Sequence, residues 1–69
     1  MNEEKYSVYK LDETKSNSIR LILNSLDKRE RKFTRKIVEN ILHKGLYNEE
    51  EKIILNSLRS EYIENVKNN

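Results

Sequence analysis

Residues 28–36 are the part of this chain best suited to binding chemistry. They hold six Lys or Arg side chains and one Glu, which sum to +5, although the 69-residue chain has a formal net charge of only +2. On a helix, Lys28, Arg31, Lys32 and Arg35 follow the spacing i, i+3, i+4, i+7 and share one face. Such a row can lie along a phosphate backbone or an acidic protein face. The alternative is an ordinary solvated helix face.

The tyrosines are the second group of candidate binding residues, because Tyr and Arg are enriched at interface hot spots. We expect Tyr47, in a turn after the single glycine, to be exposed. Tyr6 and Tyr9 lie in an N-terminal arm and can add to the same surface, whereas Tyr62 is expected in the core. The sequence therefore predicts a partner-binding surface of seven residues: Lys28, Arg31, Lys32, Arg35, Tyr47, Tyr6 and Tyr9.

Residues for catalysis or metal binding are scarce. The chain has no Cys and one His, which excludes thiolate metal sites, cysteine nucleophiles and polyhistidine sites. His43 falls near a predicted helix end, where it is a better capping cation than a general base. No Gly-rich phosphate loop is present. We expect no enzymatic activity, no catalytic residues, no cofactor and no metal.

The apolar pattern also bears on cellular location. The longest uninterrupted apolar runs, 21–23 and 53–55, are three residues long, so no membrane span is expected. Residues 1–5 show no apolar segment after a basic region, so no secretory signal is expected. These features predict a cytoplasmic protein.

Three amphipathic helices must position these residues. Apolar residues at helical spacing predict a first helix over about 13–26 and a second over about 28–44. No Gly or Pro separates the two, so a single bent helix is the alternative. The apolar faces are Ile19, Ile22, Leu23 and Leu26 in the first helix and Phe33, Ile37, Val38, Ile41 and Leu42 in the second.

Gly45 should end the second helix, because glycine adopts the left-handed conformation at a helix C-terminus without steric cost. Asn48 and Glu51 have capping-box spacing and predict a third helix over about 49–66. A turn this short makes the second and third helices an antiparallel hairpin. The apolar face of the third helix is Ile54, Leu55, Leu58, Tyr62 and Val66.

The two ends of the chain are expected to be less regular. Residues 1–12 form a short arm, and 67–69 a frayed tail. Within the arm, 5–11 alternate like a strand, but no second strand-like segment follows. This strand must therefore pair with a second copy, add to a partner's sheet, or be a loose arm on the helices.

Together these elements predict one all-α domain over 1–69, a small three-helix unit built on the antiparallel helical hairpin. A chain of this size buries only about 60% of its unfolded surface. Binding to a partner, or formation of a homodimer, is therefore favoured.

The C-terminal third of the chain contains Gly45, the capped acidic run 48–52, Leu58-Arg59 and Glu61-Tyr62. In these residues it resembles the YnzC-like family of small bacterial helical-hairpin proteins. The resemblance implies a helical hairpin, and the family supplies no established activity to carry over.

The order strand, helix, turn, helix also resembles ribbon–helix–helix repressors. In that family two copies of one strand pair and enter the DNA major groove, so 5–11 would be the strand and 13–42 the two helices. The resemblance implies obligate dimers. The chain departs from the pattern, because its inter-helix turn is charged and its strand carries only Lys5 and Lys10 as cations.

We therefore expect a small non-enzymatic regulatory or inhibitory binding protein, of the kind that phages and other mobile elements encode. It would occupy a surface of a larger protein, with a nucleic-acid-handling protein the most economical version. The alternative is a dimeric DNA-binding regulator of ribbon–helix–helix type, which would contact nucleic acid through the basic stripe.

Overall fold

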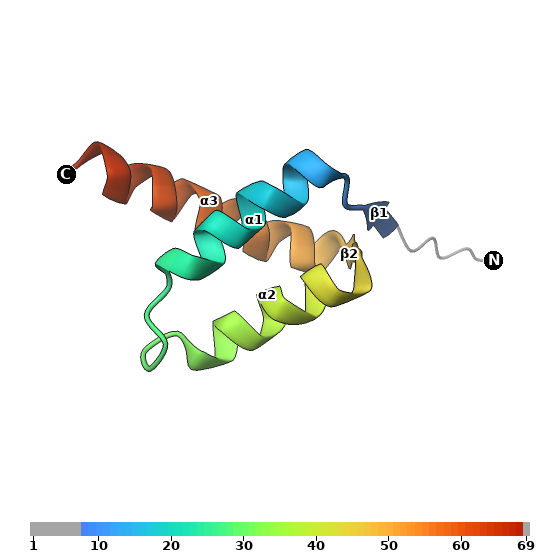
Figure 1. Cartoon of the computed structure of the whole chain (residues 1–69), viewed down its shortest axis with the longest axis horizontal. Helices are drawn as coiled ribbons and strands as arrows, with labels where there is room; N and C mark the ends of the chain where they lie inside the picture. The colour runs from blue at the N-terminus through green and yellow to red at the C-terminus, as the bar shows by residue number, and fades with distance from the viewer. Residues whose placement is uncertain (1–7, 69) are drawn as a thin grey trace.

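A computed structural model describes residues 8–68, and over these residues the protein is mostly helical with one small antiparallel sheet (Figure 1). The all-α expectation is therefore correct for the helices and misses the sheet. None of the described helices is both long and apolar enough to cross a membrane. In chain order the elements are β1 (Val8–Lys10), α1 (Glu13–Ser25), α2 (Lys32–Lys44), β2 (Leu46–Asn48) and α3 (Glu49–Lys67).

Helix α1 begins and ends close to its predicted bounds. The Asp12 carboxylate accepts a hydrogen bond from the Lys15 N–H at 2.7 Å, which satisfies one free N–H of the first turn. At the other end, Leu26 has an extended backbone with ψ of 136°. Ile19 and Ile22 lie on the buried face.

The turn between α1 and α2 makes these two separate helices. The Asp27 carboxylate accepts hydrogen bonds from the N–H groups of Arg29 and Glu30, at 2.8 and 2.9 Å. Arg31 then leaves the helical region, with φ of −112° and ψ of 30°. Helix α2 consequently begins at Lys32, four residues later than predicted.

The segment after α2 is a strand, which corrects the turn that the sequence predicted there. Gly45 adopts the left-handed conformation with φ of 74°, and its N–H donates to the Ile41 carbonyl at 2.9 Å. Strand β2 follows at once and leads into α3. The predicted capping box is present, since Asn48 and Glu51 each accept from the other's backbone N–H.

Strand β1 pairs with β2 of the same chain, so the expectation of a lone strand was wrong. The antiparallel register places Val8 opposite Asn48, Tyr9 opposite Tyr47 and Lys10 opposite Leu46.

The core lies where α1 crosses the other two helices. Helix α1 packs against both α2 and α3, and β2 packs against α2 and α3 (Figure 1). Helix α2 runs toward β2 and α3 runs back from it, as predicted, but the two helices pack mainly on α1 and β2 and make few direct contacts with each other (Figure 1). The buried residues are Ile19, Ile22, Val38, Ile41, Tyr47, Leu55 and Leu58.

Candidate functional site

The predicted basic stripe does not exist as one row, because Lys28 precedes α2 and because Arg31 and Arg35 are bound to other parts of the chain. Arg35 donates from Nη1 to the carbonyls of Leu23 and Leu26, at 2.8 and 3.3 Å, and lies 3.7 Å from Glu39. Helix α1 has no cation in its own last turn. Arg35 therefore caps the C-terminus of α1 and complements its dipole.

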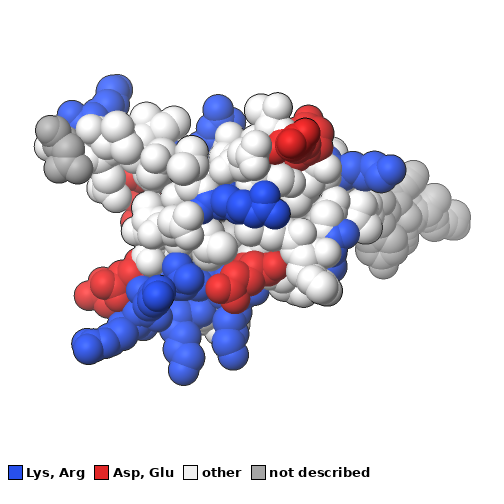
Figure 2. Space-filling model, viewed as in Figure 1, with Lys and Arg blue, Asp and Glu red and all other residues white. Residues whose placement is uncertain are grey.

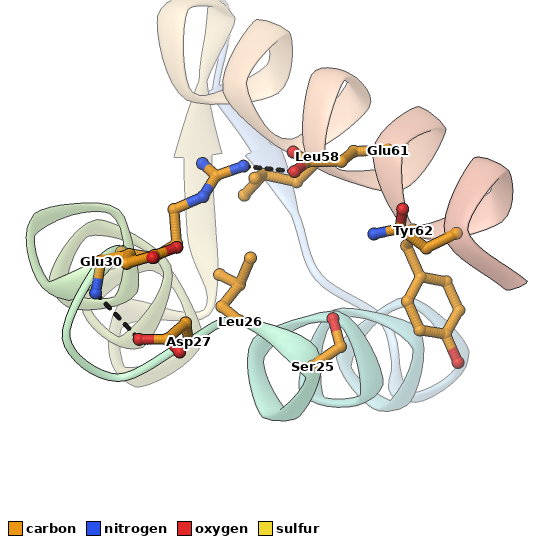
Figure 3. Close-up of a pocket in the computed structure, with 9 residues that line it drawn as sticks. Ser25, Leu26, Asp27, Glu30, Leu58, Glu61 and Tyr62 are labelled. Carbon is orange, nitrogen blue, oxygen red and sulfur yellow. Dashed lines mark hydrogen bonds and ion pairs between the residues drawn. The ribbon is translucent and has the colours of Figure 1, made fainter.

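Arg31 is held by an ion pair that connects the α1–α2 turn to α3. Its Nη2 donates to the Glu61 carboxylate, and this partner raises the pKa of Arg31 (Figure 3). The pair borders a pocket of about 160 Å³ that also contains Leu26, Leu58 and Tyr62. Arg31 thus has a structural partner in the position where a binding residue was predicted.

The same turn also places a carboxylate beside the pocket. The backbone N–H groups of Glu30 and Arg29 lower the pKa of Asp27, so its carboxylate stays ionised at neutral pH (Figure 3).

The other cations of the 28–36 run remain free at the surface. Lys28, Arg29, Lys32 and Lys36 are all exposed, and no salt bridge within residues 8–68 involves them. Figure 2 shows Lys and Arg side chains gathered on the side of the molecule where the α1–α2 turn and the start of α2 lie. We call these four cations, together with Phe33, the basic patch.

Phe33 lies within the basic patch and not in the core, contrary to the sequence prediction. Its side chain is 77% exposed, the highest value among the large apolar residues described. The buried face of α2 is set by Val38 and Ile41, and Phe33 lies about 110° around the helix from the middle of that pair, at the edge of the apolar face. The helical phase alone therefore leaves Phe33 at a boundary position, and the structure places it in solvent.

Tyr9 and Tyr47 hold the sheet to the helices, and Tyr47 is not the exposed residue that was predicted. Tyr47 is 6% exposed, and its ring stacks on half-buried Tyr9 with centroids 5.2 Å apart. Its hydroxyl accepts from Lys15 Nζ at 3.0 Å, while the Tyr9 hydroxyl donates to the Glu49 carboxylate. Tyr6 lies outside the described residues.

The chemistry available at the basic patch is anion binding combined with an apolar contact. The four free cations can meet an acidic surface, and the Phe33 ring can enter a hydrophobic pocket or stack on a flat group. His43 lies in the last turn of α2, at the opposite end of that helix from the patch. Within residues 8–68 no group of three or more His, Cys, Asp or Glu side chains could hold a metal ion.

Comparison of the chain with protein-family models, with curated proteins and with solved structures gives no match.

Proposed function

We propose that the chain is a small non-enzymatic binding protein that attaches its basic patch to an acidic surface of a larger protein and thereby regulates or inhibits it. The observation that carries this proposal is the exposure of Phe33 between cations that have no acidic partner within residues 8–68. A large apolar side chain that is 77% exposed costs free energy in water unless a partner covers it.

The arrangement has the composition of an interface hot spot. Aromatic and Arg side chains supply most of the binding energy at interfaces, and surrounding residues exclude water. Here Phe33 is the apolar contact, while the exposed cations Arg29, Lys32 and Lys36, which lie within four residues of it along the chain, guide an acidic partner by charge. Arg31 and Arg35 do not belong to this surface, since they hold α3 and α1 in place.

A nucleic acid is the second candidate partner, favoured by the four cations that lie within nine residues of the chain. A single strand could place phosphates on these cations and stack a base on Phe33. This candidate is not the ribbon–helix–helix arrangement, because Val8–Lys10 already pairs with β2 of the same chain.

Site-specific crosslinking tests the proposal. A benzoylphenylalanine replaces Phe33 in one variant and Leu21 in another, Leu21 being 59% exposed on α1 and serving as the matched control. Both variants are irradiated in a lysate of the native host, with and without nuclease. We expect a discrete, nuclease-resistant protein adduct at position 33 and none at position 21.

The cations are tested in the same assay. Changing Lys28, Arg29, Lys32 and Lys36 to Gln in the variant crosslinked at position 33 should abolish the adduct, as should raising the salt concentration. An adduct that disappears with nuclease would show that the partner of the basic patch is a nucleic acid and not a protein. Equal adducts at positions 33 and 21 would contradict both partners.

A further inference from the structure

A groove between α1 and α3 lies apart from the basic patch, and its size and lining suit a small ligand. Its volume is about 320 Å³, which is in the range of ligand pockets. The floor is apolar and consists of the core residues Ile19, Ile22 and Leu55, with Tyr47 at one side. The groove is therefore a gap over the hydrophobic core.

Three cations from two helices line this groove. Lys15 comes from α1, and Lys52 and Arg59 come from α3. Within residues 8–68 none of the three forms a salt bridge with a carboxylate. The acidic residue of the groove, Asp12, uses one carboxylate oxygen to cap α1.

The ammonium group of Lys15 is kept charged by its neighbours in the groove. The Tyr47 hydroxyl, which accepts a hydrogen bond from Lys15, raises the pKa of Lys15, and the nearby Arg59 guanidinium opposes this only weakly. Lys15 and Arg59 therefore present two positive charges to the same groove, and an anion placed there can contact both.

Lys52 and Lys15 also have defined positions. Lys52 Nζ lies 4.8 Å from the centroid of the Tyr9 ring, and Lys15 Nζ lies 5.6 Å from that of Tyr47. These contacts with rings of the sheet limit where the two ammonium groups can go. Arg59 adds a planar guanidinium, which matches phosphate oxygens in a bidentate manner.

We infer that the groove binds a small phosphate monoester, with its phosphate between Lys15 and Arg59 and a flat apolar body on Ile19, Ile22 and Leu55. Lys52 contributes further positive charge, and Thr14, Ser18 and Asn56 offer polar groups at the rim. This site is independent of the basic patch, because no residue is shared between them.

Phenyl phosphate is the probe for this inference. It is titrated into the full-length ¹⁵N-labelled protein and followed by amide chemical shifts. We expect saturable shifts confined to 12–22, 47 and 52–59. Inorganic phosphate lacks the aromatic ring, and phenol lacks the phosphate group. Each should bind at least tenfold more weakly than phenyl phosphate.

Two variants test the residues. Arg59→Gln should weaken phenyl phosphate at least tenfold, and Lys52→Gln severalfold, while the amide spectrum of each free variant stays that of a folded chain. A variant with Lys28 and Lys36 changed to Gln is the control and should bind like the parent protein. Unchanged affinity in Arg59→Gln, or inorganic phosphate binding as tightly as phenyl phosphate, would overturn the inference.

Discussion

The carboxylate of Glu51, in the first turn of α3, contacts the last residue of α2 and the last residue of β2. It accepts from the Asn48 N–H at 2.8 Å and from Lys44 Nζ at 3.1 Å, so it joins the end of α2 to the start of α3. The hydrogen bond from the Asn48 backbone, followed by that from Lys44, lowers the pKa of Glu51. A lowered pKa in the folded state means that ionised Glu51 stabilises the fold.

We expect Glu51→Gln to reduce the pH dependence of stability. Because the folded-state pKa is lowered, the contribution of Glu51 is complete above about pH 4.3, the ordinary glutamate value. It is lost as the pH falls through the lower folded-state pKa. Gln does not titrate, so the variant should be about 1 kcal/mol less stable at pH 6, and this difference should shrink as the pH is lowered toward 3.

The measurement is urea unfolding, followed by circular dichroism, at both pH values. Glu50→Gln is the matched control, since Glu50 is an exposed neighbour in the same helical turn. Its difference from the parent protein should stay small at both pH values. A loss of stability in Glu51→Gln that persists at pH 3 would contradict the role assigned to its charge.

Among the elements, α1 and α2 are connected by more than apolar packing. The carbonyls of Leu23 and Leu26 lie at the C-terminus of α1, and both accept from a cation that comes from α2. The Arg35 side chain is only 17% exposed, so its hydrogen bonds are shielded from water. The position of α2 is therefore fixed at the end of α1 by a charged contact.

Arg35→Met should lower the free energy of unfolding by about 2 kcal/mol, since hydrogen bonds to a charged group contribute about 1.5–3 kcal/mol. Urea unfolding measures this change. Lys36→Met, at the next position but exposed, should change stability by less than about 0.5 kcal/mol. Hydrogen exchange of the Leu26 amide, which donates to the Leu23 carbonyl at 3.1 Å, should accelerate in Arg35→Met. Similar losses in both variants would contradict the capping role.

For the whole molecule, the small sheet attaches the N-terminal segment to the junction of α2 and α3. Its backbone contacts include the Leu11 N–H, which donates to the Gly45 carbonyl at 3.0 Å. Tyr9 adds ring stacking on Tyr47 and a hydrogen bond to Glu49. Three residues of strand would be marginal alone, and these side chains stabilise the pairing.

Tyr9→Ala should therefore release β1 and lower stability by about 2 kcal/mol, less than for a fully buried aromatic residue. Tyr9→Phe keeps the stacked ring and should cost about 1 kcal/mol or less. Hydrogen exchange of the Leu11 amide reports the detachment directly. It should be fast in Tyr9→Ala and slow in Tyr9→Phe. Slow exchange in both would show that the ring does not hold the strand.

Much of this architecture is readable from local signals. The helices of the structure end near their predicted bounds, because Gly45 and the pair Asn48 and Glu51 act on their own backbone neighbours. Strand β2 was harder to predict than β1, because the three residues between α2 and α3 are too few to show a period of two, whereas 5–11 alternate like a strand. The pairing of Tyr9 with Tyr47 spans 38 positions and leaves no local pattern.

The candidate site was predictable only in part. The run of cations was evident from the sequence. Which of them bind within the chain and which stay free at the surface depends on where α2 begins. Arg31 leaves the helical region, which shifts that start, and Arg35 donates to carbonyls at the end of α1 that only the tertiary fold brings near. Phe33 was assigned to the core for its apolar character, but it lies at the edge of the apolar face of α2, where only the tertiary fold decides whether a side chain is covered.

The pairing of β1 with β2 has a consequence for synthesis on the ribosome. Glu49, the partner of the Tyr9 hydroxyl, is added 40 residues after Tyr9. At about 5–20 residues per second, the first strand waits roughly 2–8 seconds before its partner exists. During that interval an unpaired edge can join other nascent chains. A slow stretch of translation within the intervening helices would lengthen this exposure without changing a single amino acid.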